Sequence, residues 1–98
     1  MNHYLYKLIP PRPTFGDDMT EAESTAMRQH VEYWQGLLDK GVAVVFGPVA
    51  DPGGVWGLAV VQADDEQDVH ALGADDPAVK SHVATYEVCA MPGAFSRP

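Results

Sequence analysis

The sequence contains little basic charge and almost no cysteine. Six lysines and arginines stand against 14 aspartates and glutamates, which gives a formal net charge of −8. A nucleic-acid binder needs a basic surface to neutralise phosphates, and anionic membranes attract the same basic residues. We therefore expect neither nucleic acid nor a membrane as a partner. The single cysteine, Cys89, cannot form an intramolecular disulfide or a cysteine-rich metal motif.

Long hydrophobic runs are also missing. No segment approaches the roughly 20 apolar residues of a membrane span. The first residues, Met1 to Lys7, lack the charged-then-apolar layout of a signal peptide, so we expect a cytoplasmic protein. A length of 98 residues and a hydrophobic content of 46% are typical of one globular domain. We assign residues 1–98 to a single domain, with residues 91–98 as a C-terminal tail.

Cap and turn signals predict two helices of ordinary length and four strands. Thr20 and Glu23 have the spacing of a capping box, and Gly41 supplies a left-handed residue after the last turn, so a helix is expected between them. The prolines and glycine between Pro10 and Met19 predict an irregular loop. Asp76-Pro77 is typical of the start of a short helix. The remaining segments are predicted as strands 4–9, 42–46, 55–62 and 83–90 and a helix at 66–73.

The resulting order is β-α-β-β-α-β, which is the ferredoxin-like plan. It predicts an α+β fold in which an antiparallel sheet carries its helices on one face. Tyr4, Tyr6 and Leu8 alternate on one side of the first strand, whereas Leu5 and Ile9 lie on the other side. Because the uncovered face is still half apolar, we expect it to pack against a second copy in a homodimer.

The first helix carries a histidine on its apolar face. At 100° per residue, His30 points in the same direction as Met27, Trp34 and Leu37. An imidazole withdrawn from water needs hydrogen bonds from the protein, and an unperturbed imidazole titrates close to neutrality. One interpretation is a core histidine with both nitrogens satisfied. The other is a general acid or base at the rim of a pocket.

Two aspartates are candidates to orient His30. Asp51 and Asp76 each have a local interpretation, in a turn and in a helix cap respectively. Arg12, in the proline-rich loop, is a candidate clamp for a substrate carboxylate or else a solvated charge. No two histidines have a metal-binding helical spacing, so we expect no metal and no cofactor, with haem or metal ligation by His30 as an alternative.

Several of these motifs resemble one known family in their order and spacing. They are the run Tyr6–Pro13, the helix element His30-x-x-Tyr33-Trp34-x-x-Leu37, Gly41, Phe46-Gly47-Pro48 followed by Asp51 and Gly54, and Asp75-Asp76-Pro77. The chain resembles the YCII-related domain family over nearly its whole length. The resemblance implies a ferredoxin-like domain that dimerises through its sheets into an α+β barrel. It also implies an active-site pair at His30 and Asp76, with Asp51 as the acid found in a similar subgroup.

Some proteins of this kind are dehydrochlorinases of hydroxyquinone rings, and related dimeric barrels include lactone isomerases and monooxygenases. The resemblance favours a cofactor-independent lyase or isomerase in which His30 moves a proton on a small, cyclic or aromatic, anionic substrate. From the residues themselves, the candidates for substrate binding are Arg12, Tyr6, Trp34 and Phe15, and core packing is the alternative for Tyr6 and Trp34. Arg12 and Phe15 lie in the proline-rich loop, which shorter members of the family lack. The alternative is a non-catalytic dimeric module that binds a small molecule or regulates. That alternative predicts a histidine and an aspartate too far apart to hydrogen-bond, or no pocket.

Overall fold

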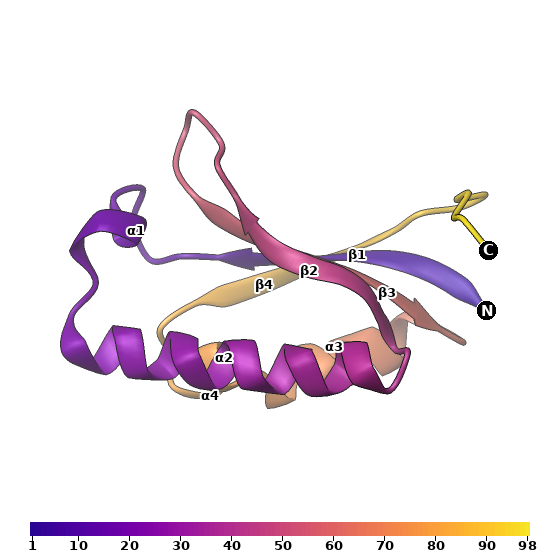
Figure 1. Ribbon diagram of the computed structural model, residues 1–98, viewed down its shortest axis with the longest axis horizontal. Helices are drawn as coiled ribbons and strands as arrows, with labels where there is room; N and C mark the ends of the chain where they lie inside the picture. The colour runs from indigo at the N-terminus through magenta and orange to yellow at the C-terminus, as the bar shows by residue number, and fades with distance from the viewer.

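A four-stranded antiparallel sheet forms one layer of the protein. The computed structural model describes residues 1–98, and its strands are β1 (Asn2–Ile9), β2 (Ala43–Val49), β3 (Trp56–Ala63) and β4 (Thr85–Ala90). Their order in the sheet is β2-β3-β1-β4, with every neighbouring pair antiparallel. This order confirms the predicted ferredoxin-like plan, in which the strands next to each other in sequence are not all neighbours in space (Figure 1).

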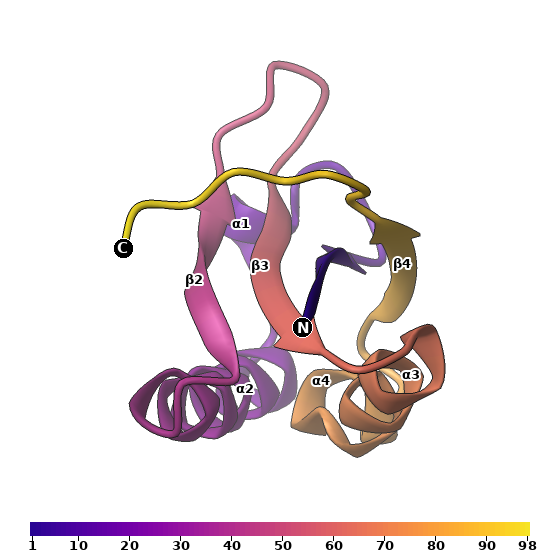
Figure 2. The same cartoon turned by 90° about the vertical axis from the view of Figure 1, so that its right-hand side faces the viewer.

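The helices form the second layer, on one face of the sheet. They are α2 (Glu21–Asp39), α3 (Glu66–Asp75) and α4 (Pro77–Lys80), and Figure 2 shows all of them below the same side of the strands. α2 begins with the predicted capping box, since the Thr20 side chain accepts from the Glu23 amide and Glu23 accepts from the Thr20 amide. Gly41 follows α2 with a φ of +80°, as expected for a helix stop. None of the helices has the length and apolar character needed to cross a membrane.

The structure corrects two local predictions. The loop from Pro10 to Met19 is not wholly irregular, because it contains the one-turn helix α1 (Phe15–Asp18), which buries the Phe15 ring. β2 does not end before Gly47 but continues to Val49. Pro48 is tolerated there because β2 is an edge strand and a missing amide donor costs no ladder bond on its open side.

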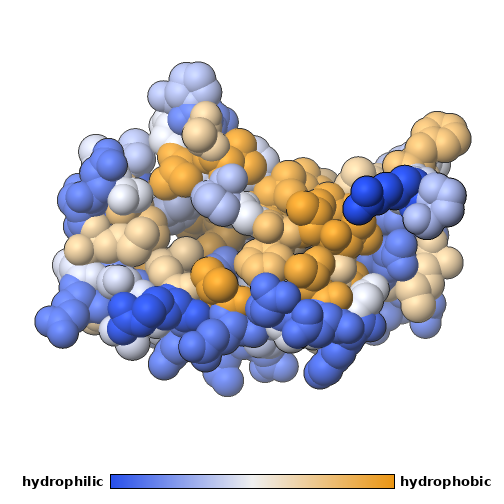
Figure 3. Space-filling view, in the orientation of Figure 1, coloured by the Kyte–Doolittle hydropathy of each residue, from blue (hydrophilic) through white to orange (hydrophobic).

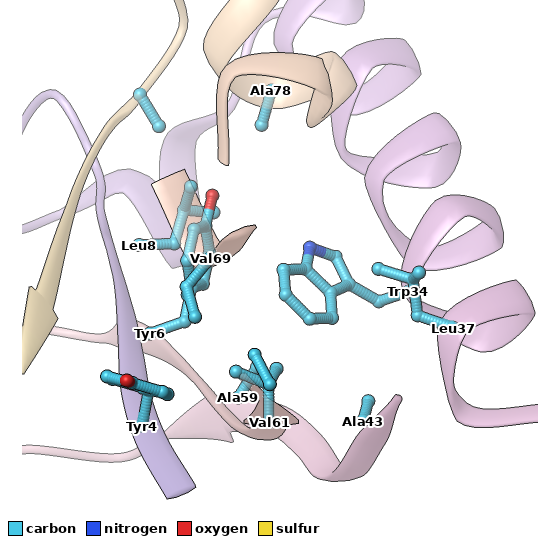
Figure 4. Packing of buried hydrophobic residues seen from close by; sticks show 12 residues of the cluster. Tyr4, Tyr6, Leu8, Trp34, Leu37, Ala43, Ala59, Val61, Val69 and Ala78 are labelled. Atoms are coloured by element: carbon cyan, nitrogen blue, oxygen red, sulfur yellow. The ribbon is translucent and has the colours of Figure 1, made fainter. Parts of the chain in front are cut away.

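The core lies between the sheet and α2 (Figure 4). Tyr4, Tyr6 and Leu8 point from β1 into this layer, as their alternation predicts, and all three are buried. Trp34 of α2 is fully buried, and its ring centroid lies 4.8 Å from that of Tyr6. A large aromatic pair therefore joins the helix to the central strand.

The opposite face of the sheet has no helix over it. Leu5 of β1 and Leu58 and Val60 of β3 lie on this face, and their side chains are only half-buried. Val45 of β2 pairs with Val60 and is 50% exposed. Apolar colour gathers over the sheet in Figure 3, whereas the outer surface of α2 is hydrophilic. The sheet thus leaves an apolar surface without a partner inside one chain.

Candidate active site

The carboxylate of Asp76 is the polar centre of the core. Its Oδ1 and Oδ2 both lie 2.9 Å from His30 Nδ1, although 46 positions separate the two residues in the chain. Tyr6 Oη donates to Oδ2 at 2.9 Å and Trp34 Nε1 donates to the same oxygen at 2.8 Å. The Ala78 amide donates to Oδ1 at 3.0 Å. Asp76 is fully buried, so every hydrogen bond it accepts comes from the protein.

The short connection between α3 and α4 positions this carboxylate. Asp76 is the N-cap of α4, Pro77 occupies the first turn, and the cap bond to Ala78 holds the side chain toward α2. The predicted cap and the predicted partner of His30 are therefore one and the same side chain. His30 and Trp34 lie four residues apart on α2, so both reach Asp76 from one face of that helix.

The surrounding donors keep Asp76 ionised. Burial alone raises the pKa of its carboxyl, but the hydrogen bond and charge of His30 and the donations from Trp34 and Ala78 outweigh it, so the pKa lies below its usual value. Burial, and then the neighbouring Asp76 charge, raise the pKa of Tyr6, which stays a protonated donor. Because the ionised carboxylate can only accept hydrogen bonds, the hydrogen between it and His30 lies on Nδ1. The neutral imidazole then presents an unprotonated Nε2.

His30 lines an apolar pocket of about 330 Å³, and its Nδ1 is the nitrogen turned to Asp76. The other nitrogen has no hydrogen-bond partner in the protein, and no buried polar side-chain atom is left unpaired, so Nε2 is in contact with accessible space. His30 is the only ionisable side chain in the lining. The pocket is lined by Leu8, Pro10, Phe15, Gly16, Met19, Met27, His30, Val31, Phe46, Gly47, Pro48, Val55, Trp56, Gly57 and Ala84. The imidazole is thus the one ionisable group in an otherwise apolar lining, and a buried carboxylate lies behind it.

Asp51, the other candidate aspartate, serves its own turn between β2 and β3. Its carboxylate accepts from the Gly53 amide at 2.8 Å and from Trp56 Nε1 at 3.0 Å. These two hydrogen bonds, the first from Gly53, hold the pKa of Asp51 below its usual value. No hydrogen bond joins Asp51 to His30. The structure therefore brings only one of the two predicted aspartates to the histidine.

Arg12 does not offer a free guanidinium to a ligand, contrary to the expected clamp. Its Nη1 and Nη2 hold the two oxygens of Glu23 at 2.9 and 2.7 Å, and its Nε holds Asp18 at 2.8 Å. Its charge also lies 5.4 Å from the centroid of the Phe15 ring. The guanidinium makes its bidentate contact with Glu23, a carboxylate of the protein itself. The turn of α1 also brings Asp18 close to Arg12. Arg12 thereby ties α1 to the start of α2.

The remaining predicted residues divide between the pocket and the layer behind it. Phe15 lines the pocket as expected. Tyr6 and Trp34 do not line it, and border only a void of about 10 Å³ beside His30. Their polar atoms turn toward Asp76, which sequence reasoning missed although a buried tyrosine or tryptophan needs a hydrogen-bond partner. Phe46 and Met27 are lining residues that were not predicted. No group of three or more histidine, cysteine, aspartate or glutamate side chains is arranged to hold a metal ion.

The fold and this site define a class of protein: a small ferredoxin-like α+β domain with a buried His–Asp pair beside an apolar pocket. The family model of the YCII-related domain matches residues 7–92. The chain therefore belongs to the YCII-related family, as its motifs predict. No protein of curated function matches the sequence.

One solved structure shows the same fold. It is 5-chloro-2-hydroxyhydroquinone dehydrochlorinase (TftG) from Burkholderia phenoliruptrix AC1100, in complex with 2,5-dihydroxybenzoquinone. The TM-score is 0.69 at 15% sequence identity, over 94% of this chain and 95% of that chain. The ferredoxin-like arrangement is thus shared from end to end, with little sequence in common.

Proposed function

We propose that this protein is a cofactor-independent enzyme in which His30 accepts and returns a proton on a small cyclic or aromatic molecule. The observation that carries the proposal is the two-sided environment of one imidazole. Nδ1 lies 2.9 Å from a buried carboxylate, whereas the ring lines an apolar pocket and its Nε2 has no partner in the protein. A histidine held in this way is a base of defined tautomer, and Asp76 stabilises the imidazolium that forms when it takes a proton.

The proposed chemistry needs only a proton acceptor and a dry pocket. His30 Nε2 takes a proton from a C–H or O–H group of the substrate, and the electron pair left behind forms a new double bond. In a lyase reaction that step expels a leaving group with its electron pair. In an isomerase reaction the imidazolium returns the proton to another atom. The dehydrochlorinase with the same fold is a lyase-type enzyme on an aromatic substrate, which favours the first course.

The lining indicates the kind of substrate. A pocket of about 330 Å³ is at the small end of the usual range for ligand sites, so it suits a single ring. Phe15, Phe46 and Trp56 offer aromatic or flat apolar surface, and His30 offers the single ionisable contact. The expected anionic group has no cation to meet it, because Arg12 is already paired. We therefore propose an uncharged ring with one acidic hydrogen rather than a substrate carboxylate.

The non-catalytic alternative has less support. It predicts a histidine and an aspartate too far apart to hydrogen-bond, or no pocket, whereas His30 and Asp76 are bonded and the pocket is formed. A cytoplasmic location and the single-domain assignment with its tail stay predictions of the sequence.

The test is proton exchange and elimination with His30→Gln. Chlorinated hydroquinones and hydroxyquinones are incubated with the protein in deuterated water, and deuterium uptake and chloride release are followed. We expect His30→Gln to lose about 10²- to 10⁴-fold in rate, as for removal of a general base. His70→Gln is the matched control, because His70 hydrogen-bonds Tyr86 and Glu66 at the outer side of α3. Full turnover in a folded His30→Gln protein contradicts the proposal.

We further propose that the uncovered sheet face binds a second copy of the chain. The face carries Leu5 and Ile9 of β1 beside Leu58 and Val60 of β3, and Leu58 lies near its centre, opposite Lys7 and Gly47. Sedimentation equilibrium is expected to give about twice the chain mass of 10.6 kDa. Leu58→Asp should release monomers, whereas Ala71→Asp, on the exposed side of α3, should not. A wild-type monomer at micromolar concentration contradicts this assembly.

A further inference from the structure

We propose that Tyr6 and Trp34 are positioning residues for His30, which act through their two hydrogen bonds to Oδ2 of Asp76. They determine which imidazole nitrogen carries the hydrogen, and they limit how tightly the carboxylate holds the charged ring. The inference rests on the proposed role of His30 as a base. It gives a role in the site to two aromatic residues that were expected to line the pocket or pack in the core.

The acceptor capacity of Asp76 is fully used. An ionised carboxylate has about four lone-pair sites. Tyr6, Trp34 and the Ala78 amide supply three donors, and His30 Nδ1 is the fourth. Two of these donors, the indole and the amide, have no means of accepting a hydrogen bond. Because these donors help to keep Asp76 ionised, the carboxylate can only accept, and the imidazole donates to it from Nδ1.

The two aromatic rings are fixed in place. Trp34 is fully buried and Tyr6 is 1% exposed. Their centroids lie 4.8 Å apart, and Tyr33 packs edge-on against Trp34 at 5.8 Å. Because the rings have no room to swing, their donors stay directed at Oδ2 while a ligand comes and goes on the other side of His30. Tyr6 and Trp34 hold Oδ2 and the Ala78 amide holds Oδ1, so the carboxylate has one orientation.

The donors also share the negative charge of the carboxylate. Without the Tyr6 hydroxyl, more of that charge acts on His30 Nδ1–H, and the protonated ring is held more strongly. Tyr6 and Trp34 thus keep a paired histidine available as a base.

Other titratable groups around the pair come from three elements. Tyr33 on α2 and Tyr86 on β4 act electrostatically on Tyr6, and Asp75 at the end of α3 acts on Tyr33. Where β2 and β3 border the void beside His30, they present Phe46, Gly57, Leu58 and Ala59, none of which ionises. Of these tyrosines, only Tyr6 donates a hydrogen bond to the Asp76 carboxylate, whereas the hydroxyls of Tyr33 and Tyr86 donate to backbone carbonyls.

The experiment compares Tyr6→Phe with Tyr86→Phe by nitrogen NMR of ¹⁵N-histidine-labelled protein. Tyr86 is a close match, because its ring stacks on that of Tyr6 at 5.4 Å while its hydroxyl contacts His70 and not Asp76. The sequence has four histidines, and the His30 signals are assigned by their loss in His30→Gln. In the wild type the neutral ring is expected as the Nδ1–H form.

Tyr6→Phe should move the titration midpoint of the His30 signals to higher pH than in the wild type, since Asp76 loses one hydrogen bond that shares its negative charge. Tyr86→Phe should leave the His30 midpoint in place and alter only the His70 signals. Trp34→Phe is a second variant that should shift the midpoint in the same direction. An unchanged or lower midpoint in Tyr6→Phe, or an equal shift in Tyr86→Phe, overturns the inference.

The NMR test of the positioning role can be distinguished from the test of the proposed reaction. The NMR signature requires no substrate, so the predicted shift in a protein without turnover supports the positioning role and counts only against the proposed reaction. If turnover does depend on His30, its pH profile should shift upward in Tyr6→Phe and not in Tyr86→Phe. A turnover profile that ignores Tyr6→Phe overturns the positioning role while leaving His30 as the base.

Discussion

Replacing Asp76 by asparagine should remove a large part of the stability of the fold. The amide has one oxygen where the carboxylate has two, and its NH₂ group adds donors to a site that is already surrounded by donors. His30 and Tyr6 can reorient their hydrogens, but the Trp34 indole and the Ala78 amide cannot. These two fixed donors point at different carboxylate oxygens, so one of them stays unpaired whichever way the amide is turned.

The cost follows from that arrangement. One unsatisfied buried donor costs about 1–3 kcal/mol, and the loss of the charged partner of His30 brings the total to about 3–5 kcal/mol. The free energy of unfolding of a domain of this size is roughly 5–15 kcal/mol, so about a fifth or more of its stability is at stake. At about 4–8 °C per kcal/mol, the melting temperature should fall by at least about 12 °C.

Urea unfolding followed by circular dichroism measures this change, with Asp75→Asn as the control. Asp75 is the exposed neighbour of Asp76, and its substitution should change the free energy of unfolding by no more than about 0.5 kcal/mol. The pKa of Asp76 in the folded protein is lowered, so the stabilisation is complete above the ordinary value of 3.8 and is lost as the pH falls through the lowered value. The free energies of unfolding of Asp76→Asn and Asp75→Asn should therefore approach each other in strong acid. Equal stabilities at pH 7 would refute the reasoning.

Two further predictions concern other parts of the chain. Gly73→Ala should destabilise by about 1–3 kcal/mol in thermal unfolding, because a Cβ there would lie 2.7 Å from the Tyr86 ring, whereas Gly36→Ala, with nothing within 4 Å, should stabilise by roughly 0.5–1 kcal/mol. Equal effects would contradict the packing at Gly73. The hydrogen bond from Arg12, and then that from the Thr20 amide, lower the pKa of Glu23 to about 2, and NMR of the side-chain carboxylate should give this midpoint. Because Glu23 pairs with Arg12, Glu23→Gln should also speed hydrogen exchange of the backbone amides in α1. A Glu23 midpoint near the ordinary 4.5 would show that the contact with Arg12 is absent in solution.

Much of the fold could be predicted because its signals are local. The capping box at Thr20 and the Asp76-Pro77 start of α4 depend on residues within one helical turn, and both are present. The alternation of Tyr4, Tyr6 and Leu8 correctly indicated the buried side of β1. The errors lie where local signals conflict with long-range packing. α1 was missed because its one buried residue, Phe15, packs in a lining that includes residues far away in the sequence, such as Phe46 and Val55.

The site was only partly predictable. His30 was identified from helical periodicity, and Asp76 was one of two candidates. The choice between Asp76 and Asp51 could not be made from the sequence, because each has a plausible local role. The role of Arg12 was misjudged for a similar reason, since a free and a paired arginine look alike until the positions of Asp18 and Glu23 are known.

By itself, the sequence determined the order of elements, the inward side of the first helix and the family. Those properties depend on propensity, caps and periodicity, which act over a few residues. Only the tertiary structure decided that His30 meets Asp76 across 46 positions and that Tyr6 and Trp34 donate to the same carboxylate. These contacts depend on how the sheet and the helices pack. A buried charge requires hydrogen-bond partners, and Asp76 becomes buried only when the two layers pack together.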